Sequence, residues 1–221
     1  MIEIKNLTKN YSIDSQIFKA VDDVSFSVKK GEMVSIIGHS GSGKTTLLSL
    51  IGGLTKPDSG EVLIDDINIW SMDDAALSRF RNKKISFIYQ FASLIPTLTA
   101  LENIMLPTAF GERTDDIRGH AEELISLVGL KEKSGAYPAH LSGGQQRRIA
   151  IARAFINRPE IILADEPTGD LDEEAESEII KLFQDMNEKK QITFVIVTHN
   201  KEIASNTKRQ LSMSNGVLSE N

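Results

Sequence analysis

The sequence predicts an α/β fold with three parts: a core on a mostly parallel sheet, an N-terminal antiparallel β subdomain and an inserted helical subdomain. Apolar runs without alternation, such as Ile161–Ala164, are typical of parallel strands covered on both faces. The segments 2–7 and 20–28 instead alternate apolar and polar residues, which is typical of antiparallel strands with one wet face. Residues 92–156 show helical patterns between strand-like segments. We expect one domain over 1–221, with 1–91 and 157–221 as its core and 92–156 as the helical subdomain.

Composition limits the possible functions. The chain has 221 residues, of which 40% are hydrophobic and 25% are charged, and this is an ordinary globular composition. Its net charge of −6 argues against a nucleic-acid binder, because phosphate binding depends on clustered Lys and Arg. The chain has no cysteine, which excludes disulfides and thiolate metal sites. No signal peptide and no window approaching about 20 apolar residues is present, so we expect a cytoplasmic protein that reaches membranes only through a partner.

The first part of the chain predicts strands followed by a glycine-rich turn and a helix. Strands are expected at 2–7 and 20–28, and Met33–Ile37 is a strand that ends in a glycine-rich segment. Lys44–Ile51 predicts a helix, which two successive glycines end. The next expected elements are a strand at 61–64, a helix at 71–82 with Ser71 as its N-cap, and a strand at 85–89.

The middle of the chain predicts helices. Thr99 and Glu102 have the spacing of a capping box, in which each side chain binds the other residue's backbone N–H. A second helix, ended by Gly129, carries apolar residues at a 3.6-residue period. Ser142 and Gln145 form another capping box, which opens a helix through residue 156.

Strand character returns after Pro159. Ile161–Ala164 predicts a buried strand, and a helix capped by Asp172 follows it, with acidic residues in its first turns, where the helix dipole favours them. Ile192–Thr198 predicts another buried strand. A last short strand at residues 217–218 is expected to close the sheet.

The strongest motif is Gly38-His39-Ser40-Gly41-Ser42-Gly43-Lys44-Thr45. It matches G-x-x-x-x-G-K-[ST] between a strand and a helix, which is the context of a P-loop. Its backbone N–H groups and the helix N-terminus favour phosphate, Lys44 adds a charge for the β- and γ-phosphates, and Thr45 offers a hydroxyl to Mg²⁺. A P-loop NTPase core with a RecA-like, mostly parallel sheet is therefore predicted. The residues expected to bind the nucleotide here are Gly38, Ser40, Gly41, Ser42, Gly43, Lys44, Thr45 and Thr46.

Two adjacent acids end the buried strand at 161–164. Asp165 and Glu166 lie at the carboxyl edge, where open α/β sheets bind ligands. Asp165 is placed to hold Mg²⁺, and Glu166 is directed to the other side, towards an attacking water. Two acids at a strand end can be merely solvated, but their combination with a P-loop favours the catalytic interpretation.

The capped turn at Ser142 has two interpretations from its residues alone. Two glycines follow a serine N-cap, so the turn is either a second phosphate site or only a helix cap. The segment Leu141-Ser142-Gly143-Gly144-Gln145, followed by Gln146-Arg147-Arg148, resembles the signature motif of ATP-binding cassette (ABC) ATPases. The roles of Arg147, Arg148 and Arg153 stay open between pairing with acids and positioning phosphate.

Other motifs of that family occur in order along nearly the whole chain. The resemblance implies that Tyr11 stacks on adenine, that Gln90 senses the γ-phosphate and ligates Mg²⁺, and that His199 is the switch histidine. It implies catalytic roles for Glu166, His199, Lys44 and Gln90, and Mg²⁺ ligation by Thr45, Gln90 and Asp165. Residues 167–172 resemble the D-loop region. In the family, Ser142, Gly143, Gly144 and Gln145 would contact ATP held by the P-loop of a second copy.

The local amino-acid sequence at Glu166–Asp172 and at Leu94–Asn103 is most similar to that of the branch of macrolide-exporter, lipoprotein-release and cell-division ATPases. The resemblance implies an ATPase that uses ATP and Mg²⁺, forms an ATP-dependent homodimer and drives a membrane permease from the inner face of the membrane. The alternative is a non-transport ATPase that transmits force or signal to a membrane partner, as in cell division. A DNA-repair or ribosome-acting ATPase does not fit 221 residues and a net charge of −6.

The sequence departs from that branch at Asp170, at Asn200, at Phe91-Ala92-Ser93 and in a short segment between Pro107 and Ile117. None of these departures falls at a phosphate or metal position. Those at 91–93 and 107–117 lie in the part expected to face the partner.

Overall fold

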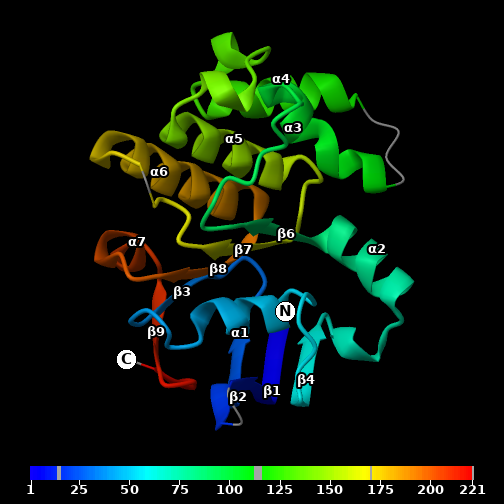
Figure 1. Cartoon of the computed structure of the whole chain (residues 1–221), viewed down its shortest axis with the longest axis vertical. Helices are drawn as coiled ribbons and strands as arrows, with labels where there is room; N and C mark the ends of the chain where they lie inside the picture. The colour runs from blue at the N-terminus through cyan, green and yellow to red at the C-terminus, as the bar shows by residue number, and fades with distance from the viewer. Residues whose placement is uncertain (14–15, 112–115, 170, 221) are drawn as a thin grey trace.

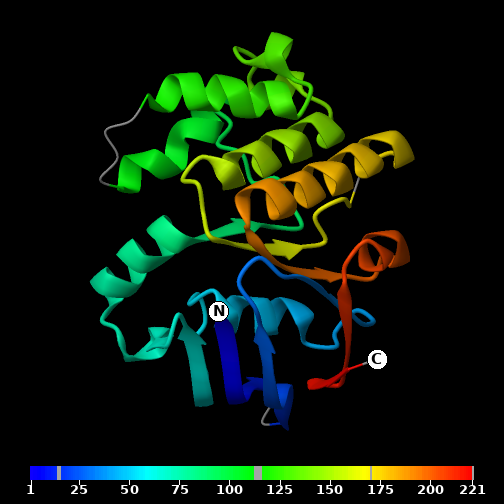
Figure 2. The same ribbon diagram turned by 180° about the vertical axis from the view of Figure 1, so that it is seen from behind.

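Helix α1 (Lys44–Ile51) lies between two β-sheets in the computed structural model, which describes residues 1–13, 16–111, 116–169 and 171–220 (Figures 1 and 2). One sheet is antiparallel and has the strand order β2-β1-β4-β5. The other has the order β10-β9-β3-β8-β7-β6 and is parallel except for the β9–β10 pair. The predicted α/β class, with an antiparallel N-terminal sheet and a mostly parallel core sheet, is confirmed.

The antiparallel sheet forms from the first part of the chain. Its strands are β1 (Ile2–Ile13), β2 (Gln16–Val28), β4 (Ser59–Ile64) and β5 (Ile67–Asn68). Ile2, Ile4 and Leu7 are almost fully buried, as the alternating pattern predicted. They pack with α1 and with one face of the larger sheet, so this sheet encloses α1 from the side opposite the core sheet.

The core sheet is buried on both faces because successive side chains of its strands pack alternately into two hydrophobic clusters, one on each face. The strands are β3 (Met33–Ile37), β6 (Ile85–Ile88), β7 (Ile161–Asp165), β8 (Thr193–Thr198), β9 (Arg209–Ser214) and β10 (Val217–Glu220). In β8, Val195 and Val197 face the α1 side, whereas Phe194 and Ile196 face the opposite cluster. This two-sided burial is the reason why these strands lack polar alternation.

Helices cover the second face of the core sheet in two layers (Figure 1). Helices α5 (Gly143–Phe155) and α6 (Glu173–Lys190) lie over the sheet, and α3 (Ala100–Met105) and α4 (Ile117–Leu127) lie beyond α5 (Figures 1 and 2). Helix α2 (Asp74–Lys84) precedes β6, and α7 (Lys201–Ser205) follows β8. Short 3₁₀ helices lie at Ile69–Ser71, Leu106–Phe110, Lys131–Lys133 and Pro138–His140.

The capping predictions are confirmed at three helices and wrong at one. Thr99–Glu102 and Ser142–Gln145 form capping boxes, and Asp172 caps α6. Ser71 does not cap α2; it ends a 3₁₀ turn, and the Asp73 carboxylate accepts the Ala76 N–H at 2.7 Å instead. Strand β9 was not predicted from the sequence, because the strand that it pairs with, β3, lies far away along the chain.

None of the helices within the described ranges is long and apolar enough to cross a lipid bilayer.

Candidate nucleotide-binding site

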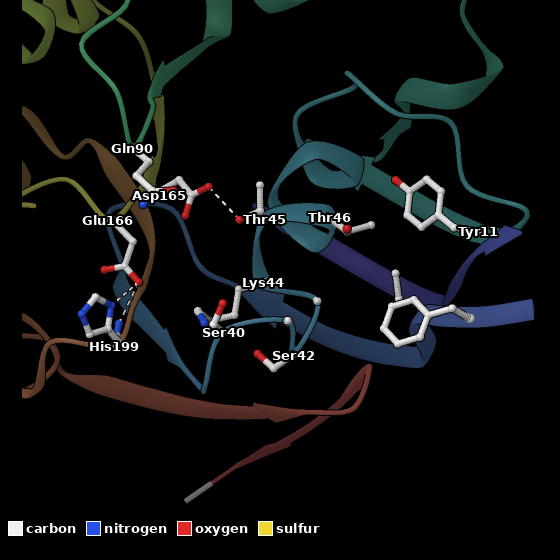
Figure 3. Close-up of a pocket in the computed structure, with 14 residues that line it drawn as sticks. Tyr11, Ser40, Ser42, Lys44, Thr45, Thr46, Gln90, Asp165, Glu166 and His199 are labelled. Carbon is white, nitrogen blue, oxygen red and sulfur yellow. Dashed lines mark hydrogen bonds and ion pairs between the residues drawn. The ribbon is translucent and has the colours of Figure 1, made fainter. Parts of the chain in front are cut away.

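A pocket of about 630 Å³ opens at the carboxyl edge of the core sheet, beside the N-terminus of α1 (Figure 3). It brings together the predicted phosphate-loop residues, the acids after β7, and residues from β1, the end of β6 and the end of β8. Residues predicted for the site that line it are Tyr11, Ser40, Gly41, Ser42, Gly43, Lys44, Thr45, Thr46, Gln90, Asp165, Glu166 and His199.

The phosphate loop needs its glycines for packing within this chain. A Cβ on Gly43, whose φ is +103°, would lie 2.0 Å from the Ala20 carbonyl oxygen. A Cβ on Gly38 would lie 2.2 Å from the Met213 carbonyl oxygen. Because real Cβ atoms do not approach backbone this closely, only glycine lets the loop pass between β2 and β9.

Lys44 lies at the first position of α1 and is 8% exposed. Its ammonium donates to the Gly38 carbonyl at 2.7 Å and to the His39 carbonyl at 3.0 Å. Gly38 itself does not line the pocket but supplies one of these acceptors. The arrangement holds the charge inside the curve of the loop, where phosphate oxygens can replace the two carbonyls as partners.

Thr45 and Asp165 are in direct contact at the pocket (Figure 3). The Thr45 hydroxyl donates to Asp165 Oδ2 at 2.8 Å. Burial raises the pKa of the Asp165 carboxyl, an effect that the Thr45 hydrogen bond opposes and the nearby Glu166 charge reinforces. A hydroxyl and a carboxylate in contact are oxygen ligands of the kind that Mg²⁺ prefers.

Glu166 adopts the left-handed region with φ +46°, which is uncommon for a non-glycine residue and is concentrated at functional sites. Its Oε2 accepts the Thr198 hydroxyl at 2.8 Å, and its Oε1 accepts the His199 backbone N–H at 3.0 Å. His199 Nδ1 lies 2.8 Å from the same Oε1 (Figure 3). The end of β8 therefore fixes the orientation of the Glu166 carboxylate at the pocket wall.

Tyr11 lies at the opposite end of the pocket from Glu166 and His199 (Figure 3). It pairs with Phe18 across β1 and β2, and both rings are about half exposed, at 41% and 48%. Lys9 Nζ lies 5.8 Å from the Tyr11 ring centroid. Two exposed aromatic faces on one hairpin provide a surface on which a flat heteroaromatic base can stack.

Gln90 follows β6 and is exposed at the pocket. Its backbone carbonyl accepts a hydrogen bond from the Arg147 guanidinium of α5.

Ser142, Gly143, Gly144 and Gln145 do not line this pocket. The Ser142 hydroxyl accepts the Gln145 N–H at 3.2 Å, and the Gln145 side chain accepts the Ser142 N–H at 3.0 Å. Ser142 and Gly143 are exposed. A Cβ on Gly143 would meet nothing within 4 Å among the described residues. Asp170, named above with the D-loop region, lies outside the described residues.

Sequence reasoning missed Phe18, Thr198 and the contacts of Arg147. Phe18 lies in the strand that follows Tyr11, so a hairpin register could have suggested it. The Thr198–Glu166 hydrogen bond joins two strand ends that are distant in sequence. No local pattern predicts it.

Comparisons with known proteins agree with this geometry. The model of the ABC transporter family matches residues 21–169. A protein of Bacteroides fragilis called lipoprotein-releasing system ATP-binding protein LolD is 44% identical over 217 residues, covering 98% of this chain and 99% of that protein. A protein of the same name from Idiomarina loihiensis is 40% identical over 219 residues, covering 99% and 96%.

Solved structures are similar over the whole chain. The dimeric structure of MJ0796, a bacterial ABC transporter cassette, has a TM-score of 0.95 and 42% identity, covering 100% of this chain and 98% of that one. A dimeric post-hydrolysis state of MJ0796 bound to ADP and phosphate has a TM-score of 0.93 at the same identity and coverage.

Proposed function

The chain belongs to the ABC transporter family as an ATP-binding, ATP-hydrolysing subunit, and we propose that two copies enclose ATP head to tail and drive a separate membrane permease. Each ATP would be held by the P-loop of one copy and by the Ser142–Gln145 turn of the other. We further propose that residues 1–91 and 157–221 form the nucleotide-binding core and that 92–156 form the helical signature subdomain.

The observation that carries this proposal is the environment of Gly143. Gly143 is the first residue of α5, and glycine has the lowest helix propensity apart from proline. The described part of the chain puts no atom within 4 Å of a Cβ at this position, and no positive φ requires glycine there. The glycine therefore suits close approach by something outside the chain, and a phosphate at the N-terminus of α5 fits that position. The dimeric cassettes of MJ0796 support the pairing of two copies.

We assign the pocket residues as follows. Lys44 and the loop N–H groups hold the phosphates and stabilise the charge that develops on them. Glu166 orients or deprotonates the attacking water, from a carboxylate that Thr198 and His199 already hold. His199 and Gln90 sense the γ-phosphate. Tyr11 stacks on the adenine, with Phe18 beside it.

The donor set also fits Mg²⁺. Thr45 Oγ1 and Asp165 Oδ2, 2.8 Å apart, offer two hard oxygen ligands, and Gln90 would add an amide oxygen. Within the described residues no group of three acidic, His or Cys side chains gathers around a common point. Mg²⁺ does not require one, because it commonly binds through one or two protein oxygens, the substrate phosphates and water. When bound, it would neutralise phosphate charge beside Lys44.

The permease is proposed to dock beside Gln90. A groove of about 650 Å³ lies between α2, β6, the Leu106–Phe110 turn and α5. Phe110 in this groove is 75% exposed, and Phe91, the residue after Gln90, is 70% exposed. Large exposed aromatics mark protein contact sites. A partner seated here would bring the chain to the inner face of the membrane, and the names of the relatives favour lipoprotein release as the coupled process.

The test is a tagged pull-down of Glu166→Gln from native membranes with ATP and Mg²⁺. We expect a transmembrane protein to co-purify. Phe110→Asp should abolish its recovery, whereas Leu127→Asp, which alters a 56% exposed leucine on α4 outside the groove, should not. Recovery of only ribosomal or DNA-associated proteins would contradict a permease-coupled function.

A further inference from the structure

Arg147 is a buried cation that holds two loops of the nucleotide pocket through their backbone. It lies in the second turn of α5 and is only 2% exposed. Its guanidinium donates Nη1–H to the Tyr89 carbonyl and Nη2–H to the Gln90 carbonyl, and Nε–H to the Gly169 carbonyl at 3.3 Å. One side chain thus contacts the segment after β6 and the turn after β7.

Both loops carry residues of the site. Gln90 lines the pocket. Gly169 ends the turn after Glu166, and the Gly169 backbone N–H donates to the Glu166 carbonyl at 3.2 Å. The carbonyls bound by Arg147 are therefore those of Gln90 itself and of the turn that follows Glu166. A shift of either loop would change the hydrogen bonds of the same guanidinium.

Arginine suits this position for a physical reason. Its guanidinium stays charged, and it presents five N–H donors in a rigid plane, so several carbonyls can be bound with fixed geometry. A lysine ammonium at the same place would keep the charge but lose the planar fork. Because the group is buried, loss of these hydrogen bonds would leave carbonyls without a donor.

A second arginine of α5, Arg153, also binds the segment after β6. Arg153, two turns after Arg147, donates to the Ala92 carbonyl at 2.8 Å and to the Ser93 carbonyl at 3.0 Å. Four of the five carbonyls of residues 89–93, all but that of Phe91, thereby accept hydrogen bonds from α5. This segment and α5 are expected to move together.

The N-terminus of the same helix is the signature turn. Ser142 caps α5, and Arg147 follows within two turns. The turn does not face the pocket of its own chain, whereas Arg147 holds the loops of that pocket. The N-terminus of α5 therefore lies at the proposed nucleotide site of the second copy. Its second turn, through Arg147, binds the loops of the nucleotide site of its own copy.

We propose that Arg147 is a positioning residue that couples the two nucleotide sites of the dimer. It transmits a shift of Gln90 and of the turn after Glu166 in one site to the Ser142–Gln145 turn, which completes the other site. This inference rests on the proposed head-to-tail dimer and assigns to it the connection between its sites.

The test compares Arg147→Lys with Arg148→Lys. Arg148 is the next residue on α5 and forms a 3.4 Å ion pair with Glu178, so the pair of variants makes the same chemical change on one helix. ATP hydrolysis is measured with each variant alone, and ATP-dependent dimerisation is measured with each variant in the Glu166→Gln background. The readouts are binding of a fluorescent ATP analogue to the monomer, the ATP concentration at half-maximal dimerisation, the Hill coefficient of ATP hydrolysis, and the melting temperature.

We expect Arg147→Lys to bind the analogue within about twofold of the parent. Its half-maximal dimerisation should need about tenfold more ATP, since hydrogen bonds to a charged group are lost, and its Hill coefficient should fall towards one. Arg148→Lys should match the parent in all of these. Arg153→Lys, which loosens only Ala92 and Ser93, should shift dimerisation in the same direction by less.

Two results would overturn the coupling role alone. The first is Arg147→Lys with unchanged dimerisation and an unchanged Hill coefficient. The second is a parallel fall of monomer binding, dimerisation and melting temperature, which would mark Arg147 as a residue needed only for folding. Failure of Glu166→Gln by itself to dimerise with ATP would overturn the head-to-tail dimer, and the coupling with it.

Discussion

The N-termini of α1 and α5 both contain glycine and suit phosphate, but they differ in almost every other respect. At α1, the loop before the helix is enclosed by β2 and β9, Ser42 and Lys44 are buried, and a pocket of about 630 Å³ is formed. At α5, Ser142 and Gly143 are exposed and are not among the residues that line that pocket.

The glycines of the two sites are required for different reasons. Gly38 and Gly43 have backbone oxygens within 2.2 Å of a Cβ placed on them, so the fold of this chain already demands glycine. Gly143 has open space. The fold of the chain itself therefore accounts for the glycines of the first site, whereas the proposed function accounts for the glycine of the second by a ligand that another copy presents.

The largest expected effect concerns the acid that only the α1 pocket has. Glu166→Gln should lower ATP turnover by about 10²–10⁴-fold, the usual cost of losing a positioned base. ATP binding should persist, and an ATP-dependent dimer should accumulate because hydrolysis no longer separates the copies. Steady-state phosphate release and size-exclusion chromatography with ATP measure the two effects. Unchanged turnover would exclude Glu166 as the catalytic acid or base.

A charge at the α5 turn tests the other side of the comparison. Gly143→Asp places a carboxylate in open space at a helix N-terminus, where acids are tolerated, so the monomer should stay folded. Repulsion of the incoming phosphate should lower dimerisation and turnover about 10²-fold. Binding of ATP to the monomer should not change, and isothermal titration measures it. A variant with normal turnover would show that the turn does not meet nucleotide.

Lys44→Ala, unlike Gly143→Asp, should impair the binding of ATP to the monomer. Loss of a charged hydrogen-bond donor inside the α1 pocket should weaken ATP binding to the monomer by about 10–100-fold, as the same titration reports. Together the two variants sharpen the comparison, because one impairs the site within a chain and the other only the site between chains. Undiminished ATP affinity in Lys44→Ala would count against the P-loop assignment.

The smallest expected effect concerns stability at the α5 turn. The capping box uses the Ser142 hydroxyl as an acceptor for the Gln145 N–H. Ser142→Ala should therefore cost about 1 kcal/mol of unfolding free energy, or about 2–4 °C in melting temperature. Ser142→Asp keeps the cap and should keep the stability while it lowers turnover. Equal turnover in Ser142→Asp and the wild type would reduce the serine to a structural cap.

Local chemistry explains most of what the sequence predicted. Strands β3, β7 and β8 and helix α1 follow from apolar runs and from the glycines that bound them. The caps at Thr99, Ser142 and Asp172 follow from side-chain oxygens that accept the backbone N–H three residues further on. The cap of α2 was misplaced because Ser71 and Asp73 are both competent caps, and a 3₁₀ turn that includes Ser71 precedes the helix.

What the sequence did not predict depends on contacts between distant segments. Strand β9 is ordered by β3, Phe18 comes to the pocket through the β1–β2 register, and Arg147 meets carbonyls nearly sixty residues away. The partners of a buried arginine are set by how α5 packs on the edge of the sheet. No spacing along the chain contains that information.

The central claim, that a second copy completes each nucleotide site, can be tested by crosslinking because the chain has no cysteine of its own. One chain would carry Ser40→Cys in the exposed part of the P-loop, the other would carry Ser142→Cys, and both would carry Glu166→Gln. We expect a disulfide between the two different chains when ATP is added under mild oxidation, and none with either chain alone. Absence of that crosslink in an ATP-bound sample would contradict the claim.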